Sequence, residues 1–271
     1  MTPLAILATA WSSLGANKLR ASLTLLGIII GVAAVISLMA VGRGAQESVT
    51  SRISSLGANL LFVRAQPTFD GTSSLTLADA YALEDEVFAP SVAAVAPELS
   101  APFAELVWES NVSYAQALGV TAAYARIRNA EVGTGQFISP AHVLNRSEVV
   151  VLGSQVAADL YGARDPVGAT VRLNDREFTV VGVLAEQGGG GFGTADTQAF
   201  VPITTAYYRL SGEGAAQGEI TIGAINVQAR SADVLDAAER EVATLLRLRH
   251  RITDYDDFTI TNQQETIETL E

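Results

Sequence analysis

The hydrophobic pattern separates one long apolar run from a body of shorter periodic segments. Residues 21–42 are 22 consecutive positions without a charged side chain. As a helix this run would rise roughly 33 Å, which matches a hydrocarbon core about 30 Å thick. A buried helix of a soluble domain would normally show a polar stripe, and a signal peptide would have a shorter apolar region before its cleavage site. The pattern therefore predicts a transmembrane helix over 18–43.

The charges that flank this run predict its orientation. Lys18 and Arg20 are the only charged residues of the first 42, and the first acidic residue is Glu47. The positive-inside tendency places the Lys18 and Arg20 side in the cytoplasm, although Arg43 at the other end partly offsets this bias. We therefore expect everything after about Arg43 to lie outside the cytoplasm.

The segment before the run predicts an amphipathic helix over 1–17. Leu4, Leu7, Trp11 and Leu14 recur at helical spacing. Such a helix would lie at the cytoplasmic interface with Trp11 among the lipid headgroups. An ordinary helical N-terminus explains the same pattern, and the sequence leaves both interpretations open.

Two glycines inside the run predict close helix packing. Gly27 and Gly31 form a G-x-x-x-G pattern. This pattern lets two helix backbones approach closely in a lipid environment, where the hydrophobic effect does not drive association. Glycine is also common in membrane helices without such a role.

The rest of the chain alternates between helical and strand periodicity and predicts an α+β domain. The first predicted elements are a stalk helix over 45–57, a strand over 59–64, a helix over 77–88 started by Thr76 and Asp79, a strand over 92–96, and a hairpin of 103–109 with 112–120. The later ones are a strand over 147–153, a helix over 154–161, a hairpin over 169–184 turning at Asn174 and Asp175, a helix over 204–210, a strand over 220–228, a long helix capped by Ser231, and a strand over 258–260.

Composition and charge exclude several classes of function. The 271 residues contain no cysteine, which excludes a disulfide framework and a thiolate metal site. The net charge is -12, and the first 42 residues carry +2, so the body carries -14. A chain with a single lysine and this acidity is not typical of a nucleic-acid binder.

The candidate chemistry is sparse. His142 and His250 are the only histidines and lie 108 residues apart in sequence, so we expect surface or loop histidines rather than a zinc site. The acidic turn at 254–257 lacks the remaining ligands of a calcium loop, which favours a solvated turn. The glycine run at 188–193 is typical of a flexible hairpin tip, with a mobile contact surface as the alternative. We therefore expect no catalytic, cofactor or metal site in this chain.

Several segments, taken in their order along the chain, resemble segments of a known transporter family. Those that resemble the start of MacB-type ABC transporter permeases are 17–20, 23–36, 42–45 and 56–63. Those that resemble the periplasmic core domain of these permeases are 150–153, 165–171, 178–184 and 201–203, and 262–271 resembles the approach to a second membrane helix. The N-terminal block is the most specific part of the resemblance.

The resemblance implies a two-lobed extracytoplasmic domain. A porter-like βα lobe would comprise 44–130, which includes the stalk, and 219–262. A strand-rich lobe over 131–218 would be inserted in it, and 263–271 would begin a stalk helix toward a second membrane helix. This division agrees with the residue patterns, which predict alternating strands and helices in 45–130 and 219–262 and short strands with many turns in 131–218.

The resemblance also implies a function as the permease subunit of an ABC transporter in the inner membrane. Its partners would be a cytoplasmic ATPase that binds ATP and Mg²⁺, a second permease copy or paralogue, membrane lipid and, in some systems, a periplasmic adaptor. The chain has no G-x-x-x-x-G-K-[ST], so we expect ATP hydrolysis on another polypeptide. The resemblance also implies three further membrane helices after Glu271. The alternatives are a lipoprotein-releasing permease of the same architecture, a membrane-anchored sensor or binding module, and a signal-anchored extracellular enzyme.

Overall fold

The computed structural model describes residues 18–55, 59–66, 75–187, 194–211 and 219–262. The chain forms two compact units, Met1–Arg52 and Ile53–Glu271. The predicted amphipathic helix over 1–17, the glycine run at 188–193 and the segment 263–271 lie outside the described residues.

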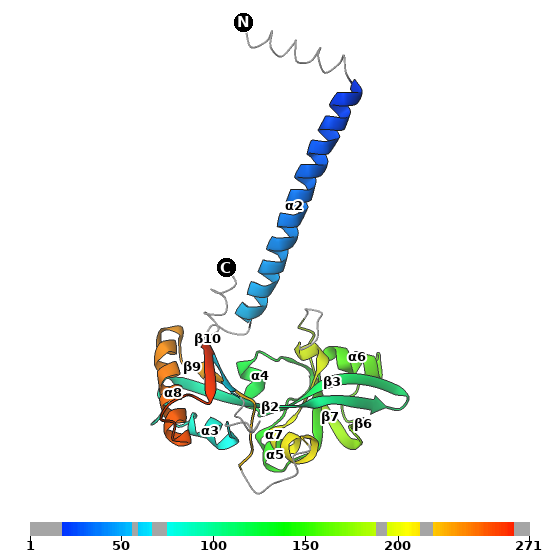
Figure 1. Cartoon of the computed structure of the whole chain (residues 1–271). Helices are drawn as coiled ribbons and strands as arrows, with labels where there is room; N and C mark the ends of the chain where they lie inside the picture. The colour runs from blue at the N-terminus through cyan, green and yellow to red at the C-terminus, as the bar shows by residue number, and fades with distance from the viewer. Residues whose placement is uncertain (1–17, 56–58, 67–74, 188–193, 212–218, 263–271) are drawn as a thin grey trace. The chain divides into compact units, whose positions relative to one another are not determined.

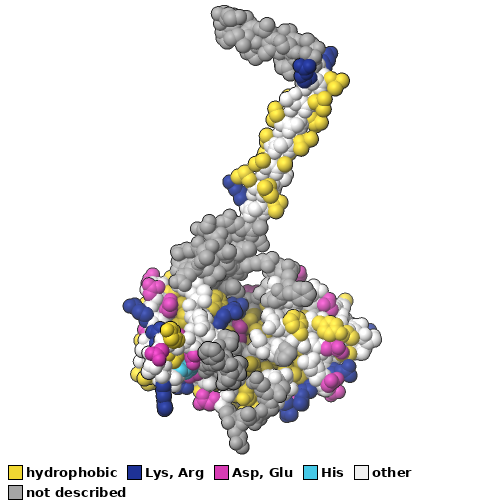
Figure 2. Space-filling model, in the orientation of Figure 1, with side chains coloured by type: hydrophobic (Ala, Val, Ile, Leu, Met, Phe, Trp, Pro, Cys, Tyr) yellow, Lys and Arg dark blue, Asp and Glu magenta, His cyan; other side chains and the backbone are white. Residues whose placement is uncertain are grey.

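The first unit is dominated by helix α2 (Lys18–Ser55), which joins the predicted membrane helix and the predicted stalk in one continuous helix. Within the described residues, Lys18–Gly44 is long and apolar enough to cross a membrane. Its leucine, isoleucine and valine side chains are all exposed, and Figure 2 shows them on the surface of the helix. A soluble helix would bury one apolar face, so this exposure is typical of a helix surrounded by lipid.

The second unit is built on a ten-stranded sheet in the order β10-β1-β9-β2-β3-β8-β5-β7-β4, with β6 paired to β2 and β7 (Figure 1). The strands are β1 (Leu60–Ala65), β2 (Val92–Trp108), β3 (Asn111–Val120), β4 (Val132–Gly135), β5 (Val149–Leu152), β6 (Thr170–Leu173), β7 (Arg176–Leu184), β8 (Gln198–Pro202), β9 (Ala224–Ala229) and β10 (Phe258–Asn262). The helices are α3 (Leu77–Ala82), α4 (Ala123–Ile127), α5 (Pro140–Leu144), α6 (Ser154–Tyr161), α7 (Ile203–Thr205) and α8 (Leu235–His250), with short helical turns over Ala195–Thr197, Ala206–Leu210 and Ala232–Val234.

The first strands form a split β-α-β unit. β1 and β2 both pair antiparallel with β9, which lies between them, so β1 and β2 run parallel and α3 connects them. The predicted β-α-β beginning is confirmed, with a strand from much later in the chain inserted into it. The predicted strands at 92–96 and 103–109 are one strand, β2, and the helix predicted over 77–88 ends at Ala82.

Turn chemistry sets the two hairpins. Glu109 and Ser110 join β2 to β3, with Trp108 opposite Asn111, and Glu109 adopts a left-handed φ of 52°. Asn174 and Asp175 join β6 to β7 with φ values of 44° and 64°. Two successive left-handed residues form the primed turn that suits the twist of a hairpin. Both predicted hairpin turns are confirmed.

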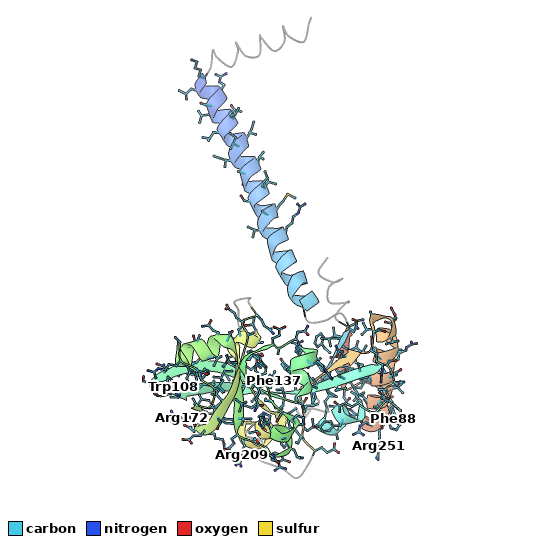
Figure 3. All side chains as sticks on the ribbon, turned by 180° about the vertical axis from the view of Figure 1, so that it is seen from behind. Phe88, Trp108, Phe137, Arg172, Arg209 and Arg251 are labelled. Carbon is cyan, nitrogen blue, oxygen red and sulfur yellow. The ribbon has the colours of Figure 1, made fainter. Side chains whose placement is uncertain are left out.

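The buried side chains form two cores on the same sheet. The first gathers around β1, β9, β10, α3 and α8, and the second around β5, β6, β7 and α6. In Figure 3 Phe88 and Trp108 mark opposite ends of this unit, with Phe137 between them. Phe137 packs with Tyr124 and Phe200 at ring-centroid distances of 6.2 and 6.0 Å in the first core.

The two cores do not follow the predicted lobe ranges. Ala104 of β2 and Ala117 of β3 belong to the second core, although both lie in the range 44–130. Ile138 and Val143 belong to the first core, although both lie in 131–218. The physical reason is the length of β2 and β3, which run through both cores and contribute side chains to each.

The start of α8 differs from the prediction that Ser231 caps this helix. A short 3₁₀ turn begins after Ser231, and the Ser231 side chain makes no capping hydrogen bond. The predicted apolar face is confirmed, because its members are all buried: Leu235, Ala238, Val242, Leu245 and Leu246.

Candidate functional site where the chain enters and leaves the sheet

The strands that connect to the two ends of the chain lie side by side. β1 begins shortly after α2 ends at Ser55, and β10 is the last strand that the structure describes. The two strands pair antiparallel, with Leu61 opposite Asn262 at one end and Ala65 opposite Phe258 at the other. The chain therefore enters the domain at the start of β1 and leaves it at the end of β10, at the same end of one ladder.

One face of β1 is anchored by apolar packing. Leu61 and Val63 are fully buried and lie opposite Val227 and Ile225 of β9, which are fully buried as well. Burial of one such side chain contributes about 1.5–3 kcal/mol. Phe258 of β10 lies on this face, because its partner Ala65 is two positions from Val63.

A charged cluster closes this face at the end of α8. The His250 ring lies between two carboxylates, with Nδ1 3.0 Å from both Asp257 oxygens and Nε2 3.1 Å from Asp79 Oδ2. Arg249 Nε donates to Asp79 Oδ1 at 2.6 Å. An ionised carboxylate can only accept a hydrogen bond, so this geometry favours the doubly protonated ring, the imidazolium, in which both nitrogens donate. The prediction of a surface or loop histidine is wrong, because this side chain is only 10% exposed.

The pKa values of this cluster shift in opposite directions. Burial alone would lower the pKa of His250, but hydrogen bonds and charge from Asp257 and Asp79 outweigh it and raise the pKa. Burial alone would raise the pKa of Asp79, but hydrogen bonds from Thr76, Arg249 and His250 lower it. Asp79 and His250 are therefore both charged at pH values between the lowered pKa of Asp79 and the raised pKa of His250.

The acidic turn after α8 is part of this arrangement. Asp256 accepts two hydrogen bonds from Arg247, at 2.8 and 2.6 Å, and Asp257 holds His250. The helix ends where Arg251 adopts a left-handed φ of 57°. The prediction of a solvated turn fits Asp254, Tyr255 and the exposed Arg247–Asp256 pair, whereas Asp257 is part-buried against His250. Within the described part of the chain, no group of three or more ligating side chains could hold a metal ion.

A second polar cluster lies on the opposite face of the same strands. Phe62 of β1 and Asn226 of β9 are cross-strand partners, and Arg64 and Glu98 are both aligned with Ala224. Asn226 Nδ2 donates to Glu98 Oε1 at 2.6 Å. The Arg128 guanidinium, just after α4, lies 5.4 Å from the centre of the Phe62 ring.

Burial dominates the electrostatics of this second cluster. It raises the pKa of Glu98, and Arg128, Asn226 and Arg64 only partly oppose the shift. Burial, with Glu98 nearby, also raises the pKa of Tyr124 to about 12. This cluster was not predicted from the sequence, where the only signal is that Glu98 and Asn226 are isolated polar residues within largely apolar segments.

The residues predicted from the sequence do not meet in this site. Gly27 and Gly31 lie in α2, where a Cβ added to either would have no other atom within 4 Å. Lys18 and Arg20 lie in the first turn of α2, Arg43 lies near the end of the apolar segment, and Trp11 is outside the described residues. Their predicted roles in packing and topology remain predictions.

We expect His250→Gln to lower the free energy of unfolding by about 2 kcal/mol near neutral pH, because one buried charge-assisted pair is lost. The raised pKa means that the His250 contribution is full below its unfolded-state pKa of about 6.5 and is lost as pH rises through the folded-state pKa. The Asp79 contribution is lost in the other direction, as pH falls through its lowered pKa.

Urea unfolding of the chain in detergent, followed by Trp108 fluorescence in a Trp11→Phe background, measures this pH profile. His142→Gln is the matched control, because His142 only accepts the Ser139 N–H in a capping box, which glutamine preserves. Equal pH profiles for wild type and His250→Gln would contradict the imidazolium assignment.

The sequence matches a family of known transporters. The family model for the MacB-like periplasmic core domain matches residues 21–245. The chain is 35% identical over 271 residues to the macrolide export ATP-binding/permease protein MacB of Rhodospirillum rubrum, and 34% identical over 267 residues to that of Azoarcus sp.. Each alignment covers 97% of this chain and 39% of the relative, so the chain spans well under half of these proteins.

The fold matches solved extracytoplasmic domains. The periplasmic region of MacB from Actinobacillus actinomycetemcomitans aligns with a TM-score of 0.66 at 22% identity, over 80% of this chain and 95% of that one. The extracellular domain of the ABC-type transporter YknZ from Gram-positive bacteria aligns with a TM-score of 0.60 at 18% identity, over 75% of this chain and all of that one. With the family match over most of its length, the chain belongs to the MacB-like periplasmic core domain family of ABC transporter permeases.

Proposed function

We propose that this chain is part of a permease subunit whose external domain is moved by a separate cytoplasmic ATPase to export substrates by mechanotransmission. The observation that supports the proposal most directly is the adjacency of β1 and β10. A domain inserted between two membrane helices needs its entry and exit strands at one place, and α2 supplies one such helix. ATP and Mg²⁺ would bind to the ATPase and not to this chain.

The packing around β1 suits the transfer of force. Residues 61–65 of this strand pair with β10 and residues 60–64 pair with β9, so a force that α2 exerts along β1 would act on two antiparallel ladders. The His250 cluster on one face and the Glu98 cluster on the other link these strands to α3, α8 and α4. β2 continues from this core into the second one.

The other parts of the proposal concern partners and cargo. The relatives are named for macrolide export, which makes a macrolide the first substrate to test. A second permease copy or a paralogue would complete the membrane unit, with lipid around α2 and a periplasmic adaptor as a further partner. The alternative functions are those of a lipoprotein-releasing permease and of a membrane-anchored sensor or binding module.

The force path is tested by loosening the connection between α2 and β1. Insertion of a short Gly-Ser segment between Ser55 and Leu60, in the full permease expressed with its ATPase, should reduce macrolide efflux by about tenfold while the complex still assembles, because a flexible linker carries little force. The same insertion after Ala163, in the exposed loop that follows α6, is the matched control. Efflux that is equal for the two insertions would contradict mechanotransmission. So would a stop codon after position 271 with no ATPase gene nearby.

Orientation is tested with single cysteines, because the chain has none of its own. We expect Tyr255→Cys, at a position that is 92% exposed, to react with a membrane-impermeant maleimide on intact spheroplasts. Ser12→Cys should react only after the membrane is permeabilised, because Lys18 and Arg20 favour a cytoplasmic N-terminus. The reverse labelling pattern would refute the proposed topology.

Gly27 and Gly31 are proposed to pack α2 against another membrane helix. Replacing both with isoleucine should weaken association of α2 by about tenfold, or about 1.4 kcal/mol, because branched side chains prevent close backbone approach. Energy transfer between labelled helices in lipid bicelles measures the change. Ala33→Ile is the control, since position 33 lies on the opposite side of the helix. If the control weakens association as much, Gly27 and Gly31 do not define the packing face.

A further inference from the structure

The outer half of β3 has an open edge. β8 pairs with β3 only from Gln116 to Val120. Among the described residues, Asn111 to Ala115 have ladder partners in β2 alone. The corresponding stretch of β2 is covered on its far side, where Leu106 and Val107 pair with β6. In this part of the hairpin, the outer edge of β2 is paired with β6, whereas the outer edge of β3 has no paired strand among the described residues.

The hydrogen-bonding groups of β3 that point to this edge can be identified. The Glu105 N–H donates to Asn174 Oδ1 at 3.0 Å, and the Glu105 carbonyl accepts the Asn174 N–H at 3.1 Å. Glu105 therefore directs its backbone groups away from its cross-strand partner, Tyr114. In such a pair the partner directs its own N–H and C=O to the opposite edge. Tyr114 and, two residues earlier, Val112 thus present their backbone groups at the open edge.

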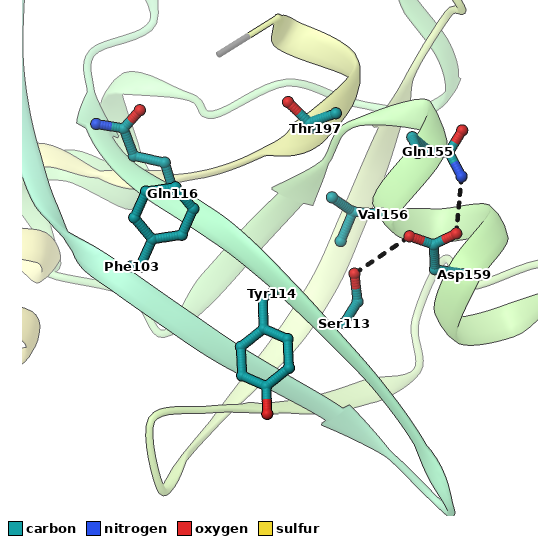
Figure 4. A pocket seen from close by; sticks show the side chains of 8 residues that line it. All are labelled: Phe103, Ser113, Tyr114, Gln116, Gln155, Val156, Asp159 and Thr197. Atoms are coloured by element: carbon teal, nitrogen blue, oxygen red, sulfur yellow. Dashed lines mark hydrogen bonds between the residues drawn. The ribbon is translucent and has the colours of Figure 1, made fainter. Parts of the chain in front are cut away.

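A cavity of about 150 Å³ lies along this edge (Figure 4). It touches Ser113, which is buried on the α6 side of β3, and also Tyr114 and Gln116 on the other side. A cavity that contacts consecutive residues on both faces of a strand wraps around the edge of that strand. Gln155 and Asp159 of α6 form its other wall, and Thr197, just before β8, closes one end.

The two sides of this cavity differ in chemistry. On one side Phe103 and Tyr114 are 64% and 66% exposed, which is unusual for large aromatic side chains. On the other side the Asp159 carboxylate accepts hydrogen bonds from Gln155 at 2.7 Å and from Ser113 at 3.4 Å. A strand lying in the cavity would present alternate side chains to an aromatic surface and to an acidic one.

We propose that an extended segment of another protein adds to the edge of β3 as a further strand. Its backbone would pair with Val112 and Tyr114, its apolar side chains would cover Phe103 and Tyr114, and a lysine or arginine would reach Asp159. Strand addition of this kind takes affinity from main-chain hydrogen bonds and specificity from alternate side chains. The net charge of -14 after residue 42 favours a basic partner over a second copy of this acidic chain.

The test uses the chain in detergent micelles and a labelled peptide of about nine residues that alternates lysine with valine. We expect it to bind at least about tenfold more tightly than a peptide of the same composition with all lysines before all valines, because only the first has a basic and an apolar face as a strand. N-methylation of the residues on one edge of the alternating peptide should leave binding intact, whereas N-methylation on both edges should abolish it. These comparisons need no change in the protein.

Two variants locate the site. Val112→Pro removes one outward N–H without removing a bond to β2, and should weaken binding by about tenfold, whereas Val112→Ala keeps the N–H and should not. Asp159→Asn should reduce the preference for the alternating lysine peptide over a matched glutamate peptide. Equal binding of the alternating and blocked peptides, tolerance of both N-methylated edges, or self-association of the chain in place of peptide binding would each overturn the proposal. Transport is not measured, so the outcome is independent of the proposed function.

Discussion

The rest of this domain depends on the pairing of β1 between β9 and β10. β1 is the first strand after α2, and both of its neighbours come from the last fifth of the chain. Without β1, fully buried Val227 and Ile225 of β9 would lose their cross-strand neighbours Leu61 and Val63. The first core can therefore close only after nearly the whole domain is available, which is the long-range pairing that makes such sheets slow to form.

The two faces of this ladder use polarity in different ways. On the face of α8, charge lies at the periphery, where His250 joins Asp79 and Asp257 around an apolar core. On the face of α4, Glu98 and Asn226 lie in the middle of the sheet and bond to each other. A slip of β2 against β9 by one residue would turn Glu98 to the apolar face, where its carboxylate would have no partner. The hydrogen bond between Asn226 and Glu98 therefore helps to specify the register of β2 against β9.

The features that the sequence predicted correctly depend on neighbouring residues. Thr76 and Asp79 form their capping box within one turn, and Asn174 and Asp175 make a hairpin turn by their own backbone preference. The long apolar part of α2 could likewise be predicted from the length and composition of one continuous segment. His250 was misjudged because its partner Asp79 lies 171 residues away, and no local pattern marks a carboxylate at that distance. The Glu98 cluster was missed for the same reason, since Asn226 is 128 residues from Glu98.

The lobe ranges stay a prediction, but the two cores cross them, which bears on how motion could pass through the domain. Segment-by-segment periodicity assigns each element to one lobe, but β2 has 17 residues and contributes to both cores. It pairs with β9 as far as Glu98, and its register with β3 shifts between Ser100 and Phe103, just before it reaches β6. Such an irregularity bends and twists a strand without breaking it. If α2 moves β1 as proposed, β2 carries the displacement into the second core through continuous backbone, and the shift at Ser100 is where its direction can change.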